Sequence, residues 1–194
     1  WLYNKGGEVV LLGLYVDDTL VLHSHDGADS FYGPFKAKFF SDWNATDEGP
    51  VADFLNMQIE RSPSGVTIHQ GPFARSLIKK YLQNGPPRSF NGNRTPFEKN
   101  FAQVISDAQL STEEPDPAIL KEYRSICGSL QYLVGATRPD LCYATNMLCR
   151  VMSKPNPECL AAAYRVLCYL DRHPDIGLTY EPTRRPLSGM SDSD

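Results

Sequence analysis

The sequence predicts an α+β fold, because the period of its hydrophobic pattern changes along the chain. Short apolar and β-branched runs bounded by turn residues, typical of antiparallel hairpins, end near residue 70. After residue 119 the apolar residues recur at helical spacing. Residues 84–118 are rich in proline and glycine and lack a clear period. Within this stretch, we expect a linker at residues 101–118.

Two hairpins are predicted before the linker. Residues 8–15 and 19–23 form the first pair of strands, and residues 16–18 form its turn. Aspartates are poor strand residues but common at tight turns, which places the two aspartates of residues 16–18 at the tip of this hairpin. Residues 54–61 and 66–70 form the second pair, joined by a Pro-Ser-Gly turn.

Helices are predicted on both sides of the linker. Asp29 or Ser30 begins the first, which runs to Phe40 with phenylalanines every four residues along one face. The second covers residues 73–82 with proline in its first turn. Residues 119–173 form a three-helix unit. Two short strands follow it, at residues 177–180 and 187–190.

Composition and charge allow a globular intracellular protein. The 194 residues suffice for one medium domain or two small ones, and hydrophobic residues make up 41%. A net charge of −4 argues mildly against a dedicated nucleic-acid binder, although a local basic face stays open. No apolar run reaches the length of a transmembrane helix. The five cysteines lack zinc-site spacing and are interpreted as reduced, small hydrophobic residues.

Asp17 and Asp18 are the residues most suggestive of chemistry. Adjacent carboxylates at the tip of an apolar hairpin offer oxygen ligands of the kind that Mg²⁺ or Mn²⁺ accepts together with substrate phosphates. Two like charges held close together cost free energy unless a cation neutralises them. The alternative is that both aspartates only shape the turn, since aspartate is common there.

Four ordered blocks of sequence resemble the reverse transcriptase of copia-type LTR retrotransposons. The first is the apolar run 10–22 around Tyr-Val-Asp-Asp, which resembles the polymerase motif Tyr-x-Asp-Asp. The second, Phe-Leu-Asn-Met-Gln-Ile-Glu at 54–60, is similar to the primer-grip hairpin of that family. The third covers 123–141, including Thr-Arg-Pro-Asp-Leu at 137–141. The last, residues 187–194, is similar to the start of an RNase H domain.

The resemblance implies the C-terminal part of the reverse transcriptase in a Pol polyprotein. Residues 1–100 would be a remnant of a right-hand polymerase palm, with antiparallel hairpins plus helices. Residues 119–182 would be a helical thumb or connection unit, and residues 183–194 a truncated start of RNase H. The chain is thus expected to be a segment of a longer protein.

The resemblance also implies roles for individual residues. Asp17 and Asp18 would be catalytic ligands of Mg²⁺ or Mn²⁺ in two-metal nucleotidyl transfer. Primer and nucleic-acid contacts would be made by Tyr15, Val16, Asn56, Met57 and Gln58. The first carboxylate of the RNase H domain would be Asp192.

The family further implies the partners and the location. The intact enzyme uses an RNA or DNA template-primer and dNTPs, and it is linked to the rest of the Pol polyprotein, with no membrane partner. The expected location is intracellular, either cytoplasmic in virus-like particles or nuclear.

Two departures from the family pattern affect the expected activity. The upstream motif with the third catalytic aspartate is absent, and so are the fingers, so the 194-residue chain alone is expected to be inactive. Asn56 stands where glycine is usual, a smaller difference. The alternative function is a non-catalytic, degenerate retroelement remnant that only folds or binds nucleic acid.

Overall fold

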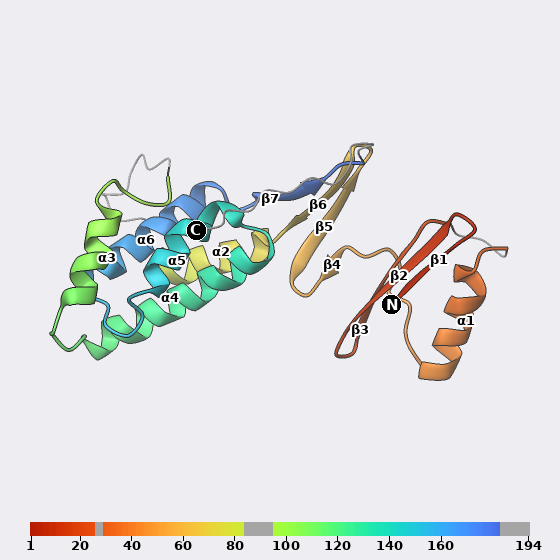
Figure 1. The fold of residues 1–194 in the computed structure, drawn as a ribbon, viewed down its shortest axis with the longest axis horizontal. Helices are drawn as coiled ribbons and strands as arrows, with labels where there is room; N and C mark the ends of the chain where they lie inside the picture. The colour runs from red at the N-terminus through yellow and green to blue at the C-terminus, as the bar shows by residue number, and fades with distance from the viewer. Residues whose placement is uncertain (26–28, 84–94, 183–194) are drawn as a thin grey trace. The chain divides into compact units, whose positions relative to one another are not determined.

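A computed structural model describes residues 1–25, 29–83 and 95–182, and the chain forms two compact units (Figure 1). Unit 1 is Trp1–Phe54 and unit 2 is Leu55–Asp194. The described residues contain antiparallel sheets and six α-helices, which confirms the α+β class. Within these ranges, no helix has the length and apolar character needed to cross a membrane.

Unit 1 is built on a three-stranded antiparallel sheet. Strands β1 (Leu2–Lys5), β2 (Glu8–Tyr15) and β3 (Asp18–His23) lie in chain order. The predicted β2–β3 hairpin is confirmed, and Tyr15 pairs with Asp18 where the strands meet the turn. Strand β1 was not predicted. It reaches β2 through two glycines that both have positive φ, a turn conformation that glycine adopts without a steric cost. A two-residue strand, β4 (Asp53–Phe54), ends the unit.

Helix α1 (Tyr32–Trp43) packs on this sheet through aromatic rings. Phe31, at its start, stacks on Tyr3 with ring centroids 3.9 Å apart, and Phe35 stacks on Trp1 at 5.6 Å. The Glu8 carboxylate of β2 accepts hydrogen bonds from the first backbone N–H groups of the segment, at 3.0 and 3.2 Å. A carboxylate at a helix N-terminus also meets a favourable dipole. The helix is therefore anchored to the sheet at its start. It ends at Trp43, past the predicted end at Phe40.

Unit 2 contains a second antiparallel sheet whose last strand comes from the end of the chain. Strands β5 (Met57–Ser62), β6 (Gly65–His69) and β7 (Gly177–Tyr180) are neighbours in that order. Strand β7 lies so close to β6 that a Cβ on Gly177 would be 2.3 Å from the Ile68 carbonyl oxygen. The predicted strand 177–180 is confirmed, whereas the one predicted at 187–190 lies outside the described residues.

The helices of unit 2 follow and surround a common core. The helices are α2 (Gly71–Tyr81), α3 (Phe101–Leu110), α4 (Pro117–Ala136), α5 (Cys142–Cys149) and α6 (Pro157–Arg172), with a 3₁₀ turn at Pro139–Leu141. Side chains cap two of them: Asp116 accepts from the Ala118 N–H at 2.7 Å, and Asn156 accepts from the Cys159 N–H at 2.8 Å. The three helices predicted within 119–173 are thus confirmed as α4, α5 and α6.

The linker predicted at 101–118 was wrong for its first ten residues. These residues form α3, and Phe101, Ile105 and Ala108 are buried along one face of it. The three positions have helical spacing, but the flanking proline and glycine residues obscured so short a period. The division of the chain also falls at residue 54 rather than near 100. The second hairpin therefore belongs with the helices in unit 2.

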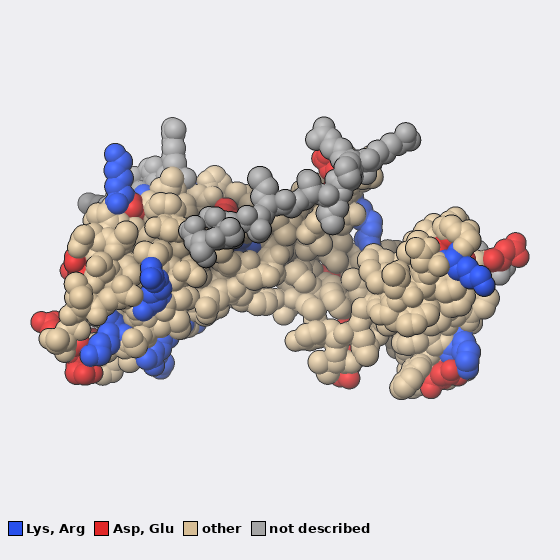
Figure 2. Space-filling model, in the orientation of Figure 1, with Lys and Arg blue, Asp and Glu red and all other residues tan. Residues whose placement is uncertain are grey.

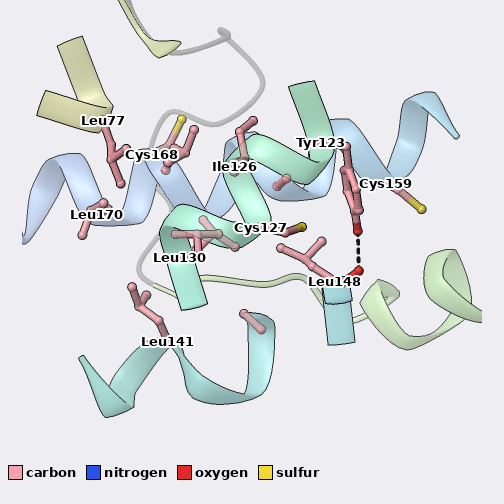
Figure 3. Close-up of a cluster of buried hydrophobic side chains, with 14 of the residues drawn as sticks. Leu77, Tyr123, Ile126, Cys127, Leu130, Leu141, Leu148, Cys159, Cys168 and Leu170 are labelled. Carbon is pink, nitrogen blue, oxygen red and sulfur yellow. Dashed lines mark hydrogen bonds between the residues drawn. The ribbon is translucent and has the colours of Figure 1, made fainter. Parts of the chain in front are cut away.

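The core of unit 2 is shown in Figure 3. Leu130, Leu141, Leu148 and Leu170 are fully buried there, and the hydroxyl of Tyr123 donates to the Leu148 carbonyl oxygen at 2.8 Å. Burial raises the pKa of the Cys127 thiol to about 12, so this thiol is an inert packing group. All five cysteines are free. Three of them are buried, as small hydrophobic residues would be, whereas Cys142 is exposed.

Candidate metal and nucleic-acid site

The β2–β3 turn carries the predicted catalytic residues at an exposed tip. Tyr15 ends β2, Val16 and Asp17 form the turn, and Asp18 begins β3. Val16 has φ 51°, in the left-handed region that a β-branched residue rarely adopts. Such a conformation costs about 1–3 kcal/mol and recurs at functional sites. Its side chain is also 79% exposed, so burial does not explain valine at this position.

The carboxylates of Asp17 and Asp18 are exposed neighbours on this turn. Among the described residues, no ion pair or hydrogen bond is found for either side chain, and no group of three or more His, Cys, Asp or Glu residues could hold a metal ion. Mg²⁺ commonly takes one or two carboxylates and completes its shell with water and substrate phosphates. The pair therefore fits part of a two-metal centre, and the described residues do not complete it.

The turn between β4 and β5 interrupts the strand predicted at 54–61, and it holds Asn56, while Met57 and Gln58 begin β5. Leu55 has φ 52° and Asn56 has φ 60°, the pattern of a two-residue type I′ hairpin turn. Asparagine tolerates this conformation better than most residues other than glycine. This explains how Asn56 can occupy a position where the resemblance implies glycine. Asn56 is exposed, and Met57 and Gln58, at the start of β5, are half-buried.

The predicted site residues thus fall into two groups, one on each turn. Tyr15, Val16, Asp17 and Asp18 lie together in unit 1, and Asn56, Met57 and Gln58 lie together in unit 2. Asp192 lies outside the described residues.

Sequence reasoning missed a contact that supports the second turn. The hydroxyl of Tyr132, on α4, donates to the Leu55 carbonyl oxygen at 2.8 Å. The two residues are 77 positions apart, and no periodic or spacing signal links them. Only the packing of α4 beside this hairpin reveals the contact.

Arg138 is a structural residue. It is 1% exposed, and it donates to both carboxylate oxygens of Asp140 at 2.9 and 2.8 Å and to the His173 carbonyl oxygen at 2.8 Å. Burial alone would raise the pKa of Asp140, but the hydrogen bonds and charge of Arg138 outweigh it and hold the pKa below its usual value.

The charge distribution shows basic and acidic groups side by side. Figure 2 shows Lys and Arg side chains near the beginning of α4, interspersed with Asp and Glu. On α2, Arg75 pairs with Asp175 at 2.6 Å, and the Lys80 amine donates to the Ser125 hydroxyl at 3.4 Å. A basic face for nucleic acid therefore stays a prediction.

Comparison with known proteins identifies relatives of the chain. No protein-family model and no solved structure matches the chain. It is 33% identical over 157 residues to an uncharacterised mitochondrial protein of Arabidopsis thaliana, covering 81% of this chain and 59% of that protein. It is 30% identical over 184 residues to the retrovirus-related Pol polyprotein from transposon RE1 of Arabidopsis thaliana, covering 90% of this chain and 11% of the polyprotein.

A third relative extends the match over nearly the whole chain. The retrovirus-related Pol polyprotein from transposon TNT 1-94 of Nicotiana tabacum is 26% identical over 195 residues, which covers 99% of this chain and 14% of the polyprotein. An α+β chain with such relatives is a retroelement protein. Its homologues are retrovirus-related Pol polyproteins from copia-type transposons, and the matches cover most of this chain. It spans only 11% and 14% of the two polyproteins, and 59% of the mitochondrial relative.

Proposed function

We propose that this chain is part of an RNA-directed DNA polymerase, in which the β2–β3 turn presents Asp17 and Asp18 as ligands of Mg²⁺ or Mn²⁺. The observation that carries the proposal is the turn itself. It joins two exposed adjacent carboxylates to a valine held at positive φ, at the tip of a hairpin. The relatives support it, because their printed descriptions are retrovirus-related Pol polyproteins.

The residues of the two turns have distinct tasks in this proposal. Tyr15 and Val16 lie against the terminal nucleotide of the primer, and Asn56, Met57 and Gln58 hold the primer backbone. Asp17 and Asp18 position the metal ions relative to the 3′ end. When bound, the ions activate the primer hydroxyl and stabilise the charge on the leaving pyrophosphate of the dNTP. Phosphoryl transfer requires a fixed orientation of the reacting groups, and these contacts would provide it by fixing the primer end relative to the carboxylates.

The resemblance to copia-type reverse transcriptases also suggests which part of the polymerase each segment forms. The proposed palm remnant, residues 1–100, includes unit 1 and the β5–β6 hairpin of unit 2, and residues 119–182 correspond to a helical thumb or connection. The remaining Pol polyprotein is the covalent partner, and residues 183–194, with Asp192, begin an RNase H domain. A complete centre needs carboxylates from separate elements, so the chain by itself is an incomplete polymerase.

One observation favours a second candidate function. The described residues offer two carboxylates and no third ligand at the site. This favours, as the second candidate, a degenerate retroelement remnant that folds or binds nucleic acid without catalysis.

Photocrosslinking tests the proposed placement of the primer. A DNA primer with a photoreactive group at its 3′ end, annealed to an RNA template, should crosslink to residues 15–18 or 56–58, as located by peptide mapping. A primer with the same group at its 5′ end is the matched control and should label other residues. No crosslink at either turn, or equal labelling from both primer ends, would contradict the proposal.

A further inference from the structure

A side chain of helix α4 makes a hydrogen bond to the β4–β5 turn. The Tyr132 hydroxyl donates to the backbone oxygen of Leu55, in the turn, at 2.8 Å. The Tyr132 ring packs edge-on against Phe73 of α2, with centroids 4.9 Å apart and planes at 79°. Tyr132 thus belongs to α4, and its contact with α2 orients the ring. Its hydroxyl makes a hydrogen bond to the backbone of the turn.

The backbone conformation of this turn is unfavourable for its sequence. Leu55 has φ 52°, a conformation in which its Cβ crowds the backbone. Asparagine and aspartate reach it with help from their polar side chains, which leucine lacks. The turn also lacks the Asn-Gly sequence that best stabilises a type I′ hairpin. A contact from outside the hairpin therefore contributes to keeping Leu55 in this conformation.

We propose that Tyr132 is a positioning residue for nucleic-acid contact at the β4–β5 turn. By holding the Leu55 carbonyl, it sets the backbone from which Asn56, Met57 and Gln58 follow directly. This inference rests on the proposed function, because it assumes that these three residues contact the primer backbone. Tyr132 acts through the turn and does not itself touch the nucleic acid, so the position of α4 determines how the contact residues are presented.

The test compares Tyr132→Phe with Tyr143→Phe in the 194-residue chain. Both substitutions remove only a hydroxyl from a partly exposed tyrosine of unit 2, and Tyr143 lies on α5 beside Phe97. The probe is an RNA–DNA hybrid with a recessed primer end, and the readouts are its Kd and the amide hydrogen exchange of residues 54–58. Tyr132→Phe should raise the Kd about fivefold, equivalent to about 1 kcal/mol, and speed exchange in the turn. Tyr143→Phe should change neither.

A rescue variant separates positioning from a general loss of stability. Leu55→Asn places a residue that tolerates positive φ in the turn and keeps the carbonyl. In this background, Tyr132→Phe should raise the Kd less than twofold. An unchanged Kd for Tyr132→Phe beside a wild-type chain that binds the hybrid would overturn only the role of Tyr132. A wild-type chain that does not bind the hybrid would contradict the proposed nucleic-acid contacts and the positioning role with them.

Discussion

Val16 is the residue at which conformation and sequence disagree most clearly. Its φ of 51° would suit glycine, and its exposed side chain gains little from packing. We expect Val16→Gly to raise the free energy of unfolding of unit 1 by up to about 1 kcal/mol, because relief of strain exceeds the extra entropy of unfolded glycine.

The control for this prediction is Val9→Gly, within β2. Glycine there should lower stability by about 0.5–1 kcal/mol, because Val9 lies in a regular strand. Urea unfolding followed by circular dichroism measures both. Destabilisation by Val16→Gly equal to that by Val9→Gly would show that Val16 is not strained.

At this scale the sequence predicted the residues of the β2–β3 turn but not their backbone conformations, and it placed Leu55 and Asn56 in a strand rather than in a turn. Asp17 and Asp18 were placed at the hairpin tip because aspartate favours turns, and they are there. The positive φ of Val16 and Leu55 runs against the preferences of those residue types, so no local rule indicates it.

At the scale of the elements, Arg138 joins the 3₁₀ turn Pro139–Leu141 to the end of α6. It pairs with Asp140 in the turn and donates to the His173 carbonyl oxygen after α6. Asp140→Asn should cost about 2–3 kcal/mol in urea unfolding, because a guanidinium that is 1% exposed loses its counter-charge. Asp42→Asn removes a charge from an exposed pair on α1 and should cost less than about 0.5 kcal/mol. Equal costs for the two variants would contradict a structural role for Arg138.

The same pair predicts a dependence of stability on pH. The folded pKa of Asp140 lies below the ordinary value of an unfolded aspartate. The carboxylate therefore contributes its stability fully above that ordinary value, and this contribution is lost as the pH falls through the lowered folded pKa. The cost of Asp140→Asn should accordingly shrink between neutral pH and pH values below the ordinary aspartate pKa.

Helix α3 provides a test of the corrected linker assignment. Ile105 is 1% exposed, so Ile105→Ala should cost about 2–4 kcal/mol of unfolding free energy. Leu110→Ala, at a position 78% exposed on the same helix, should stay within about 0.5 kcal/mol of wild type. A linker would tolerate both changes alike, and that result in denaturant melts would count against the buried face of α3.

Elements with several turns of clear period were predicted well, whereas β1 and α3 were not. Helices α4 and α6 each carry buried residues over several turns. Strand β1 has four residues and α3 ten, so each is defined more by what it packs against than by its own pattern. Their formation is a tertiary effect that single-sequence reasoning could not detect.

For the whole molecule, the α+β class and the family followed from the sequence, but the division of the chain did not. The boundary at residue 54 depends on long-range contacts, including the pairing of β6 with β7, more than one hundred positions later. Such contacts have no local signature.

The proposed function makes a clear prediction about the activity of the 194-residue chain. Two-metal transfer needs ligands from separate elements, and the described residues supply one adjacent pair. We expect no measurable primer extension with Mg²⁺, dNTPs and a primed RNA template. Extension above background that Asp17→Asn abolishes would show that the chain contains a complete centre.

The central claim is that Asp17 and Asp18 are metal ligands rather than turn formers, and paired thermal melts test it most directly. Without metal, Asp17→Asn should leave unit 1 as stable as wild type or steadier by about 0–1 kcal/mol, because it removes repulsion at an exposed site. Asparagine also suits the same turns. The control is Asp53→Asn, which removes an exposed carboxylate elsewhere in unit 1.

Millimolar Mn²⁺ should raise the melting temperature of wild type and Asp53→Asn and have a much smaller effect on Asp17→Asn. Equal Mn²⁺-induced shifts in all three proteins, or a large loss of stability in metal-free Asp17→Asn, would contradict the assignment of Asp17 as a metal ligand.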